Sequence, residues 1–168
     1  MASKEIIVSV VVPAYNEEKA IGSVLDHTIA VMDWLGTPYE VIVVDDGSTD
    51  GTRASCESRP GVTIISHHAN RGTGAARTTG VRAARGRYVL MIDADGTYPC
   101  SAIPTLLDGL AQCDMIIGAR DRETGPLRWL RSGAKSFIRA LASYLTRTKI
   151  PDLNSGLRAM NKEQVLKL

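Results

Sequence analysis

The 168-residue chain is poor in the residues that mark a disulfide-bonded or zinc-binding protein. Its three cysteines, Cys56, Cys100 and Cys113, are odd in number and widely spaced, which predicts neither a disulfide framework nor a zinc site. The only histidine cluster, His67-His68, has no cysteine or carboxylate at metal-ligand spacing, and we interpret it as a solvated strand end. A reducing, cytosolic setting is therefore the expectation.

Long apolar runs are absent as well. None approaches the roughly 20 residues that cross a bilayer. The apolar stretch Ile6–Val12 is short and no cleavage-site pattern follows it, so it predicts a buried strand rather than a signal peptide. Without repeats, low-complexity tracts or an obvious linker, residues 1–168 are expected to form a single domain.

The charged residues behind the net charge of +2 are unevenly distributed along the chain. Residues 1–60 contain ten acidic and four basic side chains, whereas residues 120–149 contain eight basic and two acidic ones. Within the basic block, an apolar stripe of helical spacing runs from Trp129 to Leu145 beside a row of basic side chains. Such a helix can lie on an anionic membrane surface or receive a phosphorylated acceptor. A core-packing helix with a solvated face is equally compatible with the pattern.

Short β-branched runs alternate with helical patterns, which predicts an α/β fold with a mostly parallel sheet and helices on both faces. The expected strands are Ile6–Val12, Glu40–Val44, Val62–Ser66, Arg87–Ile92 and Asp114–Gly118. Helices are expected from Ile21 to Leu35, over 72–85 and over 101–112, the first of them capped by Asn16. In open α/β sheets ligands bind outside the carboxyl ends of the strands.

Acidic clusters follow three of the expected strands: Pro13 to Glu17, Asp45-Asp46 and Asp93-Ala94-Asp95. Together at one sheet edge they predict either a bound cation or strong mutual repulsion. Two carboxylates at i and i+2 suit Mg²⁺ or Mn²⁺, which take their remaining ligands from phosphate and water. An acidic turn that stabilises its own backbone is the alternative for the last cluster. We expect Asp46 to contact a ligand, and Ser48 to Asp50 to cap the following helix.

Gly72 to Arg77 imitates the glycine-rich dinucleotide-binding loop. Arg77, however, replaces the third glycine, which permits close packing of helix on strand, and the loop follows the third strand rather than the first. We therefore predict no dinucleotide site here. No Walker-type phosphate loop is present.

Taken together, the segments resemble the family 2 glycosyltransferases with the Rossmann-like GT-A nucleotide-sugar-binding fold, and most closely the polyprenyl-phosphate sugar synthases of the dolichol-phosphate mannosyltransferase group. The matching segments occur in the family's order and span nearly the whole chain: 12–18, 44–52, 70–76, 91–99, 118–120 and 152–158. Relatives continue beyond the position of Leu168, so the resemblance implies a catalytic domain truncated at its C-terminus.

The resemblance assigns roles to individual residues. It implies that the nucleoside is held by Pro13, Tyr15, Glu17, Val44 and Asp46. It also implies that the metal and diphosphate are held by Asp93 and Asp95, with backbone contact from Ala94 and a phosphate held by Arg120 and, less directly, Arg131. Thr97 stands where the mannosyltransferases often carry a Gln that binds the metal, and it is the candidate for a third ligand.

The implied activity is inverting, metal-dependent transfer of a hexose from a GDP- or UDP-linked sugar to a polyprenyl phosphate at the cytosolic face of a membrane. Transfer to a saccharide hydroxyl is a close alternative. A sugar nucleotidyltransferase and a non-catalytic nucleotide-sugar-binding module are alternatives of other classes. Nucleic acid is not an expected partner.

Overall fold

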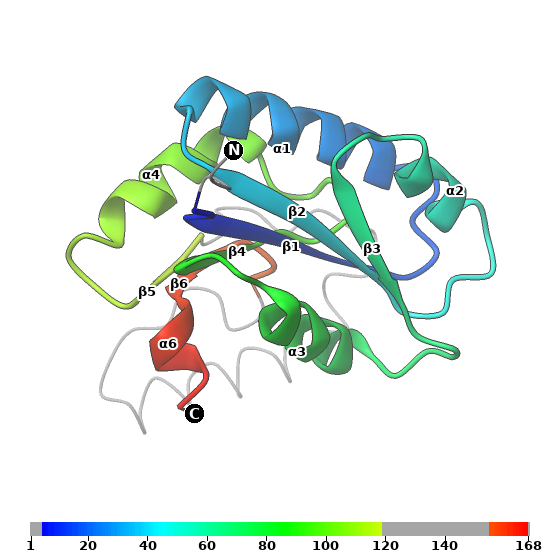
Figure 1. Ribbon diagram of the computed structural model, residues 1–168. Coiled ribbons are helices and arrows are strands. Elements are labelled where there is room, and N and C mark those ends of the chain that lie inside the picture. The colour runs from blue at the N-terminus through cyan, green and yellow to red at the C-terminus, as the bar shows by residue number, and fades with distance from the viewer. Residues whose placement is uncertain (1–4, 119–154, 168) are drawn as a thin grey trace, which may run out of the picture. The chain divides into compact units, whose positions relative to one another are not determined.

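The computed structural model describes residues 5–118 and 155–167 (Figure 1). Apart from Gly118 and Ser155, these belong to one compact unit formed by Met1–Ile117 and Gly156–Leu168. Its six strands form one sheet in the order β3-β2-β1-β4-β6-β5. Their bounds are β1 (Val8–Ala14), β2 (Tyr39–Asp45), β3 (Val62–Ser66), β4 (Tyr88–Met91), β5 (Met115–Ile117) and β6 (Arg158–Asn161). The first four strands are parallel and β6 is antiparallel to both of its neighbours, which confirms the mostly parallel α/β prediction.

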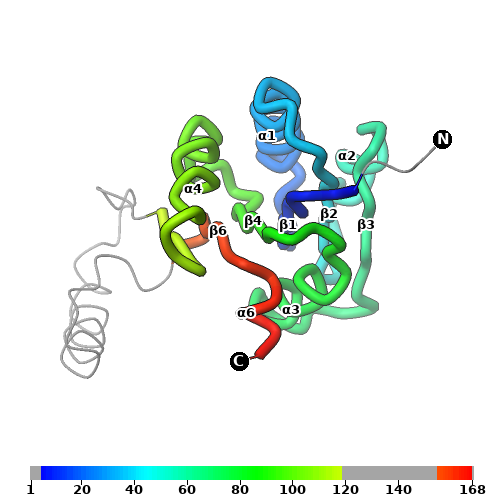
Figure 2. Tube along the Cα trace, turned by 60° about the vertical axis from the view of Figure 1, so that its left-hand side comes forward, coloured from blue at the N-terminus to red at the C-terminus, as the bar shows by residue number. Residues whose placement is uncertain are grey.

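Helices cover both faces of this sheet, as Figures 1 and 2 show. On one face lie α1 (Ile21–Leu35), α2 (Thr52–Glu57), the 3₁₀ turn η1 (Cys100–Ala102) and α4 (Ile103–Gly109). On the other face lie α3 (Thr73–Ala83) and α6 (Lys162–Val165). The expected helices and the first five strands are all present; α1 and β3 have the expected bounds, and the ends of the others are displaced by one to three residues. Helix ends fray and their exact limits depend on local hydrogen bonds, which periodicity does not encode.

The core lies in two layers because successive strand residues point to opposite faces. Val10 and Val12 of β1 pack with Ile21 and Leu25 of α1 on one side. Val11 packs on the other side, together with residues of β2 and α3. All seven residues of β1 are buried, which explains why its sequence is almost continuously apolar.

Gly80 allows α3 to lie close to the sheet. A methyl group at this position would overlap Cγ1 of Val11 and lie 3.3 Å from Cγ2 of Val44. The close helix–strand packing that a dinucleotide loop obtains from its third glycine is therefore obtained here from a glycine one helical turn later. Arg77 stands where the dinucleotide fingerprint has its third glycine. The glycine that allows α3 to pack on the sheet is instead Gly80, three residues later.

Two expectations about local structure are wrong. Asn16 does not cap α1: the helix begins at Ile21, and its N-cap is Ala20, which makes no side-chain cap. Asn16 instead has a left-handed backbone (φ 55°), and its side chain binds a neighbouring loop. No strand is expected after Asp114–Gly118, yet the segment that follows Gly156 forms β6. A four-residue strand carries too short an apolar pattern to be recognised, and its pairing with β4 is decided by tertiary contacts.

In the part of the chain that the structure describes, no helix is long and apolar enough to cross a bilayer.

Candidate functional site

A cavity of about 350 Å³ opens at the carboxyl ends of β1, β2 and β4. It is lined by Pro13, Ala14, Tyr15, Glu17, Asp46, Asn70, Gly72, Thr73, Ala76, Asp93, Ala94 and Asp95. The register explains why these segments meet, since Ala14 pairs with Asp45 and Val11 pairs with Met91. The chain runs from β1 outward to β3 and then returns to β4 on the other side of β1. The cavity therefore lies at the topological switch point, where α/β sheets bind ligands.

One corner of the cavity is made by two loops that hold each other. The backbone N–H of Asn16 donates to Ser48 Oγ (3.0 Å), and Asn16 Oδ1 accepts from the backbone N–H of Thr49 (2.8 Å). The N–H of Glu17 donates to Thr52 Oγ1 (2.8 Å). These contacts account for the left-handed backbone of Asn16. The N-cap of α2 is Gly51, not one of the residues expected to cap this helix, although Asp50 beside it accepts from the N–H of Thr52 (3.0 Å).

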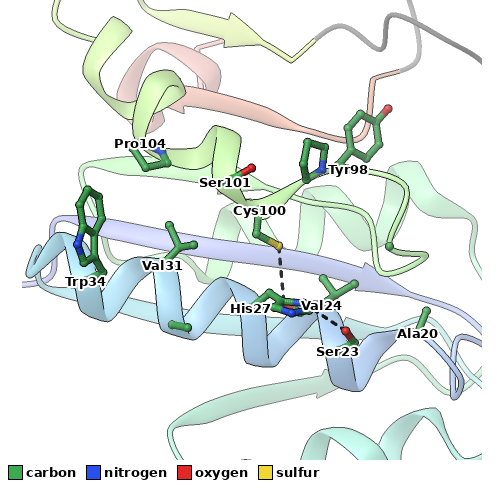
Figure 3. Close-up of a pocket in the computed structure, with 13 residues that line it drawn as sticks. Ala20, Ser23, Val24, His27, Val31, Trp34, Tyr98, Cys100, Ser101 and Pro104 are labelled. Atoms are coloured by element: carbon green, nitrogen blue, oxygen red, sulfur yellow. Dashed lines mark hydrogen bonds between the residues drawn. The ribbon is translucent and has the colours of Figure 1, made fainter.

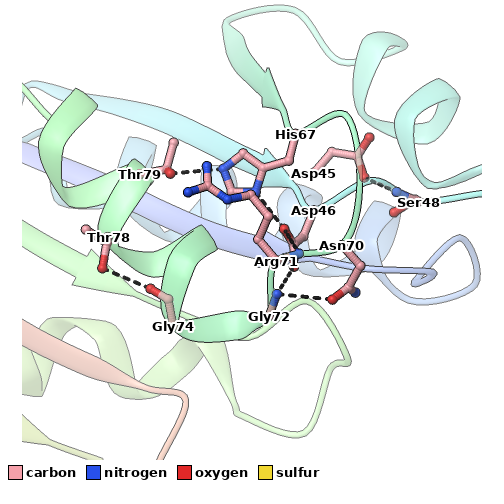
Figure 4. Close-up of polar contacts among 10 residues, drawn as sticks. All are labelled: Asp45, Asp46, Ser48, His67, Asn70, Arg71, Gly72, Gly74, Thr78 and Thr79. Carbon is pink, nitrogen blue, oxygen red and sulfur yellow. Dashed lines mark hydrogen bonds and ion pairs between the residues drawn. The ribbon is translucent and has the colours of Figure 1, made fainter.

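Asp46 is buried and organises a second wall of the cavity (Figure 4). Its carboxylate accepts from the backbone N–H groups of Arg71 (3.0 Å) and Gly72 (2.8 Å) and lies 2.6 Å from Nδ1 of His67. Burial opposes ionisation of this carboxyl, but the three hydrogen bonds outweigh it and hold the pKa of Asp46 below its ordinary value. Gly72, with φ 88°, allows the loop to turn so that its N–H reaches the carboxylate.

His67 corrects an expectation from the sequence. Only 7% of its side chain is exposed, and its Nε2 lies 3.0 Å from Thr79 Oγ1 while Nδ1 faces Asp46. It is a buried connector between β3, α3 and the end of β2, not a solvated strand end. Sequence spacing did not reveal this role because Asp46 lies 21 residues away.

Asp93 is held from two sides. Nη2 of Arg77 donates to its Oδ1 at 2.9 Å. A side chain at Gly156 would overlap its carboxylate, so the backbone at the start of β6 packs directly against it. The N–H of Gly156 in turn donates to the hydroxyl of the buried Tyr98 (2.6 Å). These contacts orient the Asp93 carboxylate at the edge of the cavity.

Asp95 is exposed and closes a tight turn. Its Oδ1 accepts from the N–H (2.9 Å) and Oγ1 (2.7 Å) of Thr97. Thr97 does not line the cavity, and its hydroxyl supports Asp95. Its role as a metal ligand stays a prediction.

Four carboxylates and no basic side chain are among the residues that line the cavity, and Arg77 pairs with one of these carboxylates, that of Asp93. Burial raises the pKa of Glu17, and the carboxylates of Asp95, Asp50 and Asp93 raise it further. Such a cluster suits a hard cation. Among the described residues, no three His, Cys, Asp or Glu side chains form a group that could hold a metal by themselves. The site therefore fits Mg²⁺ or Mn²⁺ if most of the ligands come from a diphosphate and water.

Most of the residues assigned from the sequence meet at this cavity: Pro13, Tyr15, Glu17, Asp46, Asp93, Ala94 and Asp95. Val44 does not, because its side chain is fully buried in the core between the sheet and α3. Arg120 and Arg131 lie outside the described residues.

The roles of Asn70, Gly72, Thr73 and Arg77 were missed. Gly72, Thr73 and Arg77 belong to the glycine-rich segment that imitates a dinucleotide loop, and Asn70 lies two residues before it. The glycine-rich segment itself could have revealed these roles, because α3 begins there and Gly72 and Thr73 line the cavity.

A larger apolar groove, of about 1000 Å³, runs between α1 and the segment that follows Asp95 (Figure 3). It extends from Ala20 to Trp34 along α1, and Cys100, Ser101 and Pro104 line its other side. Its lining contains no carboxylate.

Comparison with known proteins identifies the family. The model of glycosyl transferase family 2 matches residues 9–167. The chain belongs to this family. Among curated family 2 relatives, an undecaprenyl-phosphate 4-deoxy-4-formamido-L-arabinose transferase from Edwardsiella ictaluri is 33% identical over 159 residues, which cover 90% of this chain and 48% of the relative. The chain thus spans about half the length of the curated relatives it matches.

Solved structures agree with this assignment. Glucosyl-3-phosphoglycerate synthase from Mycobacterium tuberculosis in complex with UDP is 26% identical and superposes with a TM-score of 0.77, covering 97% of this chain and 59% of that one. The same synthase with Mn²⁺ and UDP-glucose gives 27% identity and a TM-score of 0.75, covering 97% and 58%. The family 2 member described here therefore has the fold of the GT-A glycosyltransferases that the sequence predicts.

Proposed function

We propose that this chain is the nucleotide-sugar-binding part of a metal-dependent, inverting glycosyltransferase that transfers a sugar from a uridine-diphosphate donor to a polyprenyl phosphate. The observation that carries the proposal is the convergence of Glu17, Asp46, Asp93 and Asp95 on one cavity that also contains the first residue of α3.

The donor would lie with its nucleoside against Tyr15 and the loop that Asp46 holds. Pro13 and Glu17 complete that side of the cavity. The N-terminus of α3 faces it at Gly72 and Thr73. Because the first N–H groups of a helix have no partner within it and lie at its positive end, this terminus suits the diphosphate. A uridine donor is favoured over a guanosine one by the UDP complexes of the structural neighbour.

Asp93 and Asp95 would hold the cation beside the diphosphate, with Ala94 in backbone contact. When bound there, Mg²⁺ or Mn²⁺ would neutralise the negative charge that develops on the departing nucleoside diphosphate. The crystal complex of the neighbour with Mn²⁺ and UDP-glucose supports a divalent ion. The resemblance to family 2 glycosyltransferases makes Arg120, and more weakly Arg131, further candidates for phosphate binding.

The acceptor is proposed from two observations. The curated relatives are named for undecaprenyl phosphate. A phosphate monoester has a second pKa near ~6 and is already an anionic nucleophile at neutral pH, so it needs no general base. None of the three histidines lines the cavity, and both ring nitrogens of His67 already face hydrogen-bond partners. The relatives' names specify an arabinose derivative, a pentose, where the sequence suggested a hexose. Peripheral contact with the cytosolic face of a membrane follows as part of the proposal.

The structural neighbour suggests a second candidate acceptor, because it is named for synthesis of glucosyl-3-phosphoglycerate. In that case the acceptor would be a small soluble acid, and no membrane would be involved.

Calorimetry of the chain with UDP, GDP and dTDP, each with and without Mn²⁺, tests the donor site directly. We expect UDP to bind only weakly without Mn²⁺ and at least tenfold more tightly with it. Equal binding of all three nucleotides, or no binding, would contradict the proposed donor.

Radiolabelled UDP-sugar offered with undecaprenyl phosphate in vesicles, with 3-phosphoglycerate and with soluble saccharides separates the acceptors. Label in the lipid fraction alone is the expected result. Label in a soluble product would instead favour the second candidate or a saccharide hydroxyl.

A further inference from the structure

Arg77 connects α3 to the expected cation site. Its Nη2 lies 2.9 Å from Asp93 Oδ1, and the two side chains are only 22% and 27% exposed. Its Nε is buried and has no hydrogen-bond partner in the part of the chain that the structure describes. The guanidinium is therefore committed to Asp93 in a partly desolvated position, where charge interactions exceed those of an exposed pair.

This pairing restricts what a cation can find in the cavity. One oxygen of Asp93 is taken by Arg77, and the backbone of Gly156 packs against the carboxylate. A divalent ion arriving alone would meet the positive guanidinium nearby and would find Asp95 and Glu17 as the other carboxylates beside Asp93. The described residues also lack a group of three ligands that could compensate.

A nucleoside diphosphate changes this balance because it brings both oxygen ligands and negative charge. The charge offsets the guanidinium, and the oxygens complete the coordination that two carboxylates cannot provide. The affinity for the cation should then rise when the nucleotide binds, and the size of that rise should depend on Arg77.

We propose that Arg77 is a positioning residue that serves as the counter-ion of Asp93 and suppresses cation binding until the diphosphate is present. The proposal deepens the proposed function and rests on it. By linkage, the factor by which UDP tightens Mn²⁺ binding equals the factor by which Mn²⁺ tightens UDP binding, and Arg77 contributes to that shared factor.

The test measures Mn²⁺ binding to the folded chain by the electron paramagnetic resonance signal of free Mn²⁺, first alone and then with saturating UDP. Arg77→Met removes the charge and keeps the length of the side chain. We expect it to bind Mn²⁺ alone about tenfold more tightly than the wild type, since a unit positive charge has left the site. The effect of UDP on Mn²⁺ affinity should shrink by a similar factor. Arg77→Lys keeps the charge and should stay within about twofold of the wild type.

Arg82→Met is the matched control, because Arg82 lies on the same helix, carries the same charge and is exposed. It should leave Mn²⁺ binding unchanged. A merely structural role for Arg77 would weaken Mn²⁺ and UDP binding together, whereas the proposal requires a gain in Mn²⁺ affinity. If Arg77→Met unfolds, as judged by circular dichroism, Arg77→Gln takes its place.

Unchanged or weaker Mn²⁺ binding by the folded Arg77→Met variant, or by Arg77→Gln where it takes its place, in a chain that binds UDP with Mn²⁺, would overturn the role of Arg77 and leave the proposed function intact. An equal gain in Arg82→Met would overturn it too. Failure of every variant and of the wild type to bind UDP and Mn²⁺ in any combination would overturn the proposed function together with this inference.

Discussion

Gly156 packs so closely against Asp93 that a single added methyl group would overlap the carboxylate. The two residues are 63 positions apart in the chain, and the pairing of β6 with β4 brings them together. The Asp93 carboxylate is therefore positioned by a backbone as well as by the Arg77 side chain.

Gly156→Ala is expected to lower the free energy of unfolding by about 1–3 kcal/mol, the usual cost of overpacking. It should also weaken UDP binding in the presence of Mn²⁺, because Asp93 must move. Urea unfolding and calorimetry check the two effects. Gly74→Ala is the control: nothing lies within 4 Å of a methyl group there, and it should stabilise the chain by about 0.5 kcal/mol. Equal effects of the two substitutions would contradict the steric explanation.

Asp95→Asn is expected to weaken binding of UDP with Mn²⁺ at least tenfold and to abolish sugar transfer. The amide oxygen can still accept from Thr97, so the turn and the free energy of unfolding should be kept within about 0.5 kcal/mol. Calorimetry and urea unfolding measure both. Asp114→Asn, on an exposed residue away from the cavity, should change neither. Full activity of Asp95→Asn would remove Asp95 from the metal site.

Asp46→Asn should destabilise the chain by about 2 kcal/mol at pH 7. The amide has one acceptor oxygen instead of two, and its NH₂ group would face the N–H donors of Arg71 and Gly72.

The stability difference caused by Asp46→Asn should also depend on pH. The pKa of Asp46 in the folded chain lies below its unfolded value of about 3.9, so its stabilisation is complete above that pH and is lost as the pH falls through the folded pKa. Urea unfolding between pH 3 and pH 7 should therefore show the gap between wild type and variant narrowing below about pH 4. The exposed Asp108→Asn provides the reference, and a gap that is constant with pH would contradict the assigned hydrogen bonds.

Gly80→Ala should cost about 1–3 kcal/mol, because the methyl group would overlap the side chain of Val11. Combining it with Val11→Ala should restore part of the loss, since the second substitution makes room for the first. A double-mutant cycle by urea unfolding measures this coupling. Strictly additive losses would show that α3 does not contact β1 through these two residues.

The sequence by itself determined the order and type of most elements. A continuous apolar run such as Val8–Ala14 favours burial on both faces of a sheet, and the apolar stripe from Ile21 to Met32 favours burial of one face of a helix. It also determined that acidic residues follow β1, β2 and β4. Since parallel strands end at one edge, most of the cavity residues could be named in advance.

The tertiary structure decided which partner each side chain has. His67 and Asp46, Arg77 and Asp93, and Gly156 and Asp93 are far apart in sequence, and no local pattern records their contacts. The short strand β6 and the left-handed Asn16 likewise depend on neighbours from other segments. Periodicity reports which face of an element is buried, because that depends on the element alone. Hydrogen bonds and close contacts depend on how several elements pack, and only the folded chain fixes them.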